Sequence, residues 1–310
     1  MADAAPLIGT PSAAVPPGGA AEWFAGAGGA RLRAALFPAT GEPRGSVVVN
    51  PGRTEPIEKY FEVVETLRAR GFAVLVHDWR GQGLSARLTP DRRLGHADGS
   101  DDFLTDFQRL LAAFEDRLPK PWIAVGHSMG GCLTLLALAR GEQRFCAAIL
   151  SAPMLGLQIG NIPLPVARAI AALAKRFGRG AAAAIKVPAG SIPFDANTLT
   201  HDRARYARNE AQVAACPDLA LGAPTWGWLD FAFSATRELR SGPGLPRISV
   251  PLTVLVAGQE RLVDNAEARL VTKRVPGARY VEIPGAYHEL MQETDDVRAV
   301  FWREFDALRL

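Results

Sequence analysis

The chain has 310 residues, 48% hydrophobic and 22% charged, which suits one large α/β domain or two small ones. Its net charge of +3, without a long basic run, argues against nucleic acid as a partner. The three cysteines are far apart and form no Cys-x-x-Cys pair, so they indicate neither a disulfide framework nor a zinc site. Reduced thiols in a cytoplasmic setting are the simplest interpretation.

The N-terminal segment, residues 1–21, is rich in Ala, Pro and Gly and contains no Lys or Arg. Prolines interrupt its apolar residues, so it lacks the basic start and continuous apolar stretch of a secretory signal. We expect a disordered extension. Nowhere in the chain do about eighteen apolar residues run together, so no membrane-spanning segment is predicted.

From residue 31 onward, short apolar runs alternate with segments of helical period. The runs predict strands at 31–37, 46–50, 72–76, 122–125, 147–150, 252–256 and 280–283. The helical patterns lie at 57–70, after Ser100, at 129–140, after Asn265 and from Asp295. Strands that are apolar throughout and alternate with helices predict an α/β fold with a mostly parallel sheet covered on both faces.

Residues 155–246 interrupt this alternation. The segment is helical in character and too long for a loop between two core strands, so we interpret it as an inserted helical cap, or lid. The core would then comprise residues 22–154 and 247–310. In a parallel sheet, functional groups gather beyond the carboxyl ends of the strands, which directs attention to four connections: 50–55, 126–131, 257–265 and 285–289.

One of these connections, Gly126-His127-Ser128-Met129-Gly130, fits the pattern Gly-x-Ser-x-Gly between a predicted strand and a predicted helix. In that context the serine occupies a strained turn that lifts its hydroxyl above the sheet, and small neighbours are required. The N–H of Met129, at the start of the helix, would point toward an oxyanion. The pattern predicts that Ser128 is a nucleophile.

A serine nucleophile needs a base and an acid that orients it. His288 follows the last predicted strand, and the chain order nucleophile, acid, histidine selects it among the five histidines. The acid should follow the strand before it, where Glu260 and Asp264 both qualify. We favour Glu260, which is nearer the strand end, and keep Asp264 as the alternative acid.

A second oxyanion donor should follow the early strand, and the backbone N–H of Arg53 in Asn50-Pro51-Gly52-Arg53 is the candidate. Two roles are possible for the Arg53 side chain: it could hold the loop in place through Glu55, or it could bind a phosphate.

Several motifs together resemble the bacterial lysophospholipase branch of the α/β-hydrolases, which is related to the monoacylglycerol lipases. They are DWRGQGLS at 78–85, GHSMGG at 126–131 and GAYHEL at 285–290, with NPGRTEP, RLTPDRRLGH, SAPM, LTHDRARYARN and GAPTWGW elsewhere. The resemblance covers about residues 30–305, cap included, and implies the α/β-hydrolase fold. It assigns the nucleophile to Ser128, the base to His288 and the oxyanion amides to Arg53 and Met129. Its acid position, usually Asp, falls on Glu260.

The resemblance implies hydrolysis of an acyl ester, of a lysophospholipid or a monoacylglycerol, through an acyl-enzyme and without a metal or other cofactor. An acyltransferase using a lipid alcohol and an esterase for short soluble esters remain alternatives. Trp226, Trp228 and Phe231 in the cap could wall an acyl-chain site, or form the cap's own core. The cap helix around 163–180 joins apolar residues to basic ones, so it could rest on the inner face of an anionic membrane or remain a solvated face. The sequence does not indicate an oligomeric state.

Overall fold

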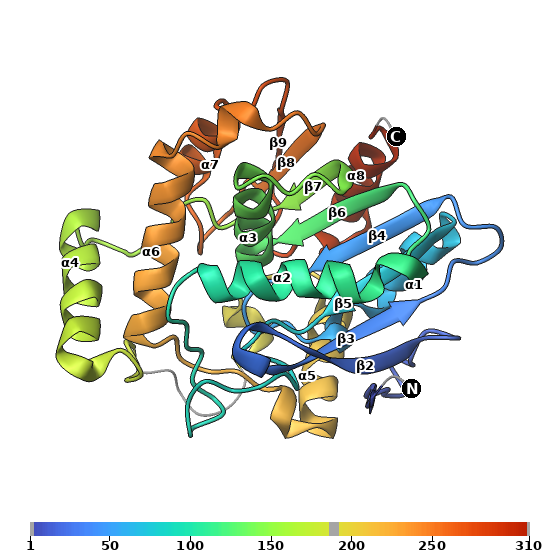
Figure 1. Ribbon diagram of the computed structural model, residues 1–310, viewed down its shortest axis with the longest axis horizontal. Coiled ribbons are helices and arrows are strands. Elements are labelled where there is room, and N and C mark those ends of the chain that lie inside the picture. The colour runs from blue at the N-terminus through green and yellow to red at the C-terminus, as the bar shows by residue number, and fades with distance from the viewer. Residues whose placement is uncertain (1–2, 186–191, 309–310) are drawn as a thin grey trace.

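The computed structural model describes residues 3–185 and 192–308, which form a single large sheet flanked by helices (Figure 1). Its strand order is β1-β2-β3-β5-β4-β6-β7-β8-β9, and every pair from β5 to β9 is parallel. The strands of this parallel part are β4 (Gly45–Asn50), β5 (Phe72–His77), β6 (Trp122–His127), β7 (Phe145–Ser151), β8 (Leu252–Ala257) and β9 (Arg279–Ile283). The predicted α/β-hydrolase architecture is confirmed.

Helices cover both faces of the sheet because its strands are apolar on both sides. On one face, α2 (Asp101–Phe114), α3 (Ser128–Ala139) and α7 (Asn265–Thr272) pack into one hydrophobic cluster with the strands. On the other face, α1 (Phe61–Ala69) and α8 (Asp295–Asp306) form a second cluster. Figure 1 shows α2 and α3 on the near face, with the carboxyl ends of β6 and β7 directed toward the segment inserted after β7.

The amino-terminal segment differs from the predicted disorder. Residues 1–2 lie outside the described part, but β1 (Asp3–Ala5) pairs antiparallel with β2 (Ala20–Ala25), which in turn pairs with β3 (Arg31–Phe37). Two contacts anchor the intervening chain: Ile8 N donates to a carboxylate oxygen of Glu58, and the Arg33 guanidinium donates to the Pro6 carbonyl. Composition missed this segment because its contacts follow no helical or strand period. It is held by backbone pairing, by buried polar partners, and by Leu7, Ala13 and Val15, which pack against the second cluster.

The motif DWRGQGLS at 78–85 forms a buried network of hydrogen bonds and ion pairs that links the end of β5 to β3 and to α2. The Asp78 carboxylate accepts from Arg33 Nε at 2.7 Å, from Ile57 N at 2.9 Å and from Leu84 N at 2.8 Å. Arg80 donates to Asp106 on α2. Because each charge has a carboxylate or guanidinium partner, burial of the cluster is compensated. The motif therefore stabilises the packing of β3, β5 and α2 against one another.

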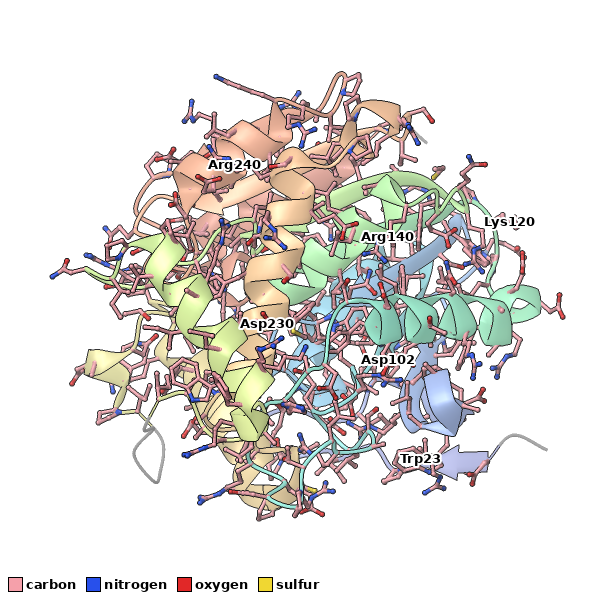
Figure 2. The ribbon with its side chains drawn as sticks, turned by 60° about the vertical axis from the view of Figure 1, so that its left-hand side comes forward. Trp23, Asp102, Lys120, Arg140, Asp230 and Arg240 are labelled. Atoms are coloured by element: carbon pink, nitrogen blue, oxygen red, sulfur yellow. The ribbon has the colours of Figure 1, made fainter. Side chains whose placement is uncertain are left out.

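The segment between β7 and β8, which we call the cap (155–246), carries α4 (Leu164–Ala174), α5 (Arg203–Ala215) and α6 (Trp226–Ser241). Residues 186–191 of the cap lie outside the described residues. Helix α6 packs against α3, and α4 packs against the other side of α6. Figure 2 shows Asp230 on α6 beside α4, where it pairs with Lys175 at 3.2 Å. The cap therefore covers the carboxyl edge of the sheet in two helical layers.

Candidate active site

The turn between β6 and α3 has the strain expected of a nucleophile elbow. Ser128 has φ +50°, an unfavourable conformation for a residue with a Cβ. A Cβ at Gly126 would lie 2.8 Å from the Gly131 Cα, and one at Gly130 would lie 2.1 Å from the Asn50 carbonyl oxygen, so the turn requires glycine at both places. Ser128 keeps part of its surface exposed although its neighbours are buried.

His288 is buried in the connection after β9, and Glu260 in the connection after β8. Parallel pairing of Ala257 with Ile283 brings these two connections together. His288 Nδ1 lies 2.7 Å from Glu260 Oε2. Because a carboxylate only accepts, His288 must carry its proton on Nδ1, which leaves Nε2 as a free acceptor. The ring also lies 4.8 Å, between centroids, from that of His127, the residue before Ser128, so the imidazole lies beside the elbow.

The other carboxylate oxygen of Glu260 is fixed by its own loop. It accepts from the backbone N–H groups of Arg261 at 2.9 Å, Leu262 at 2.8 Å and Val263 at 3.3 Å. Burial alone would raise the pKa of Glu260, but the hydrogen bond and charge of His288, together with these amides, lower it below its ordinary value. The carboxylate therefore stays ionised and oriented toward His288.

Asp264, the alternative acid, has a different role in the structure. It is the N-cap of α7, and its side chain accepts from Ala266 N at 2.8 Å and Glu267 N at 3.2 Å. Of the two predicted acids, Glu260 is the one that contacts His288.

The connection after β4 lies directly beside the elbow because Asn50 pairs with Gly126 across the sheet. Trp79 Nε1 donates to the Pro51 carbonyl and Gln82 Nε2 to the Gly52 carbonyl, both at 2.8 Å, while Gly52 N donates to Glu55. These bonds fix the loop and occupy its other polar groups. Within the described residues, no hydrogen bond is found from the backbone N–H of Arg53 or of Met129. Both predicted oxyanion donors are therefore available.

The Arg53 side chain does not bind Glu55, one of its two predicted roles. Its Nη2 donates to the Gly222 carbonyl in the cap, and its guanidinium carbon lies 5.2 Å from the centroid of the Trp228 ring. Glu55 instead accepts from Tyr60 Oη at 2.6 Å and pairs with Lys59 at 2.9 Å.

Sequence reasoning missed a buried ion cluster beneath the connections after β4 and β9. Lys59 pairs with Glu55 of the connection after β4 and with Glu289, the residue after His288, and all three side chains are buried. Burial alone would lower the pKa of Lys59, but the two carboxylates raise it, so its charge is retained. The i, i+4 spacing of Glu55 and Lys59 was the available signal, although nothing in the sequence brings Glu289 to them.

The three cap aromatics occupy different places. Phe231 is only 1% exposed, and its ring lies 5.0 Å from that of Phe103 on α2, so it belongs to the core between cap and sheet. Trp228 is 8% exposed and lies beneath Arg53. Trp226 is half-buried. A role for them in substrate binding remains a prediction, although the packing of Phe231 fits the alternative of a cap core.

This arrangement suits nucleophilic acyl transfer: a strained serine, an imidazole held by a carboxylate, and two free amides at one edge of the sheet. The described residues include no group of three or more side chains suited to holding a metal ion. Among the described helices, none is long and apolar enough to cross a bilayer.

Comparison with known proteins extends this picture. Residues 41–295 match the family described as Serine aminopeptidase, S33. The chain is 38% identical over 272 residues to lysophospholipase L2 of Escherichia coli (strain K12), covering 82% of this chain and 77% of that protein. It is 29% identical over 279 residues to a monoacylglycerol lipase of Mycolicibacterium smegmatis, covering 88% and 91%.

Among solved structures, a soluble variant of monoglyceride lipase from Saccharomyces cerevisiae superposes with a TM-score of 0.74 at 19% identity and covers 97% of both chains. At this identity the likeness concerns the fold alone. The match over residues 41–295 and the 38% identity, together with the sheet and its elbow, establish that the chain belongs to the S33 family of α/β-hydrolases.

Proposed function

We propose that the protein hydrolyses the acyl ester of lysophospholipids, and more slowly that of monoacylglycerols, through an acyl-enzyme on Ser128. The observation that carries the chemistry is the buried pair of His288 and Glu260, 2.7 Å apart, beside a serine held at positive φ. The substrate class follows from similarity to a lysophospholipase over most of the chain.

In this mechanism Ser128 Oγ attacks the ester carbonyl while His288 Nε2 takes its proton. The negative charge that develops on the carbonyl oxygen is bound by the N–H groups of Arg53 and Met129, each contributing on the order of 3 kcal/mol. When the ester C–O bond breaks, His288 gives the proton to the leaving glycerol oxygen. Water then attacks the acyl-enzyme by the same path in reverse, and fatty acid leaves.

The substrate class is tested by measuring fatty-acid release from 1-oleoyl lysophosphatidylethanolamine, 1-oleoylglycerol and a soluble butyrate ester. We expect kcat/KM to be highest for the lysophospholipid. Activity confined to the butyrate ester would contradict a long-chain lipid substrate. If a glycerolipid alcohol is supplied and acylated product forms in excess of free fatty acid, the protein is an acyltransferase instead.

We further propose that the cap contacts a membrane surface through the outer face of α4 and the turn after it. Four large apolar side chains are exposed there, Val166, Ile170, Leu173 and Phe177, and Ile162 is exposed just before the helix. Phe177 is 74% exposed, and Arg176 and Arg179 beside it are also exposed. An apolar face flanked by basic residues is typical of helices that lie in the interface of an anionic bilayer.

Binding to vesicles tests this contact. We expect Leu173→Ser combined with Phe177→Ser to weaken sedimentation with phosphatidylglycerol-containing vesicles by about tenfold or more, because two large apolar side chains no longer enter the lipid. Leu270→Ser, at a residue 46% exposed on α7, is the matched control and should bind as wild type. Equal binding by all three proteins would contradict a role for this face.

A further inference from the structure

Arg53 is a cation without an anionic partner beside the proposed oxyanion site. The buried arginines Arg33, Arg68, Arg80 and Arg298 each pair with a carboxylate. Among the described residues, no carboxylate lies within ion-pair distance of the Arg53 guanidinium. Its Nε is buried and makes no hydrogen bond. Burial lowers the pKa of the guanidinium to about 10, so it is still charged at neutral pH.

A second side-chain donor without a hydrogen-bond partner lies next to Arg53. The Trp228 side chain is buried, its Nε1 also lacks a hydrogen-bond partner, and its ring faces the Arg53 guanidinium at 5.2 Å. Leaving a buried donor unpaired is unfavourable, and more so for a charged donor. Both groups only donate, so their complement is a group with several acceptor oxygens and negative charge.

The position of Arg53 relates this site to the substrate. Its backbone N–H is a proposed donor to the ester oxygen, and its Nε lies about five bonds further along the same residue. In a 1-acyl lysophospholipid, about six bonds separate the ester carbonyl carbon from phosphorus. One residue can therefore contact both ends of the glycerol unit. The guanidinium is held in place because its Nη2 donates to the Gly222 carbonyl. It also packs closely against Gly95, where a Cβ would lie 2.8 Å from Nη2.

We infer that the Arg53 guanidinium and the Trp228 indole N–H form a subsite for the phosphate of the lysophospholipid headgroup. This inference rests on the proposed function. A guanidinium suits the group because it binds phosphate oxygens through paired N–H donors, whereas a monoacylglycerol offers only hydroxyl groups at the same place. The subsite would make the phosphodiester, rather than the acyl chain, the feature that separates the two substrates.

The test is the ratio of kcat/KM for 1-oleoyl lysophosphatidylethanolamine to that for 1-oleoylglycerol, which have the same acyl chain. A hydrogen-bonded charge is worth about 1.5–3 kcal/mol, so Arg53→Gln should lower this ratio by about 10- to 150-fold. Trp228→Phe, which keeps the ring and loses one neutral donor, should lower it by about fivefold. Arg53→Lys keeps the charge but loses the planar pair of N–H donors, so its kcat/KM ratio should lie between those of wild type and Arg53→Gln.

Arg87 is the matched control, because it too binds cap carbonyls, those of Asp218 and Ala220, without a carboxylate partner. Arg87→Gln should leave the ratio unchanged. If Arg53→Gln lowers kcat/KM equally for both lipids, the side chain only holds the loop or the cap, and the inference is overturned. If wild type hydrolyses neither lipid, the proposed function itself has failed.

Inhibition of 1-oleoylglycerol hydrolysis gives a second readout that does not use the phospholipid as substrate. We expect glycerophosphoethanolamine to inhibit wild type competitively, with an inhibition constant about tenfold or more higher for Arg53→Gln. Inhibition of the same reaction by inorganic phosphate, compared with inhibition by glycerophosphoethanolamine, distinguishes a headgroup subsite from a general anion site. Inhibition by inorganic phosphate but not by glycerophosphoethanolamine would overturn the assignment to the headgroup.

Discussion

Ser128→Ala is expected to lower kcat for lysophospholipid hydrolysis by about 10⁵- to 10⁶-fold, because the acyl-enzyme can no longer form. The alanine keeps the Cβ and so leaves the turn, with its φ of +50°, under the same strain. Folding should therefore be preserved, and the loss should appear in turnover alone. Fatty-acid release measured beside the unfolding temperature of each protein checks both points.

Ser151→Ala provides the control for this prediction. Ser151 ends β7, the strand next to the elbow, and its buried hydroxyl oxygen lies 3.3 Å from His127 Nδ1. It shares the environment of the site but has no place in the mechanism, so kcat should stay within a few-fold of wild type. Residual turnover in Ser128→Ala above about one thousandth of wild type would mean that another group is the nucleophile.

The sequence was sufficient for the parts of the site that depend on strand ends. Apolar runs located every strand of the parallel sheet, and the ends of β4, β6, β8 and β9 carry the predicted loops. The register Asn50 with Gly126 and Ala257 with Ile283 then brings residues from distant positions together. This works because parallel strands bring their carboxyl ends to one edge whatever their separation along the chain.

Side-chain partners across that edge could not be predicted in the same way. Lys59 and Glu289 are 230 positions apart in the chain, and Arg53 is 169 positions from the cap carbonyl of Gly222, so tertiary packing alone brings these partners together. Strand β1 was missed for a related reason, since an edge strand of three residues has no periodic pattern to detect. Local patterns set the elements, while such long-range polar contacts depend on tertiary packing.

Glu260→Gln is expected to lower kcat by about 10³- to 10⁴-fold while leaving the fold intact, because it changes the tautomer of His288 rather than its position. With an amide N–H₂ facing the ring, Nδ1 becomes the acceptor and the proton moves to Nε2, which can then no longer take the Ser128 proton. Asp264→Asn is the matched control. Asparagine caps helices as well as aspartate does, so α7 should remain capped and kcat should change less than about threefold. A larger loss from Asp264→Asn than from Glu260→Gln would reverse the assignment of the acid.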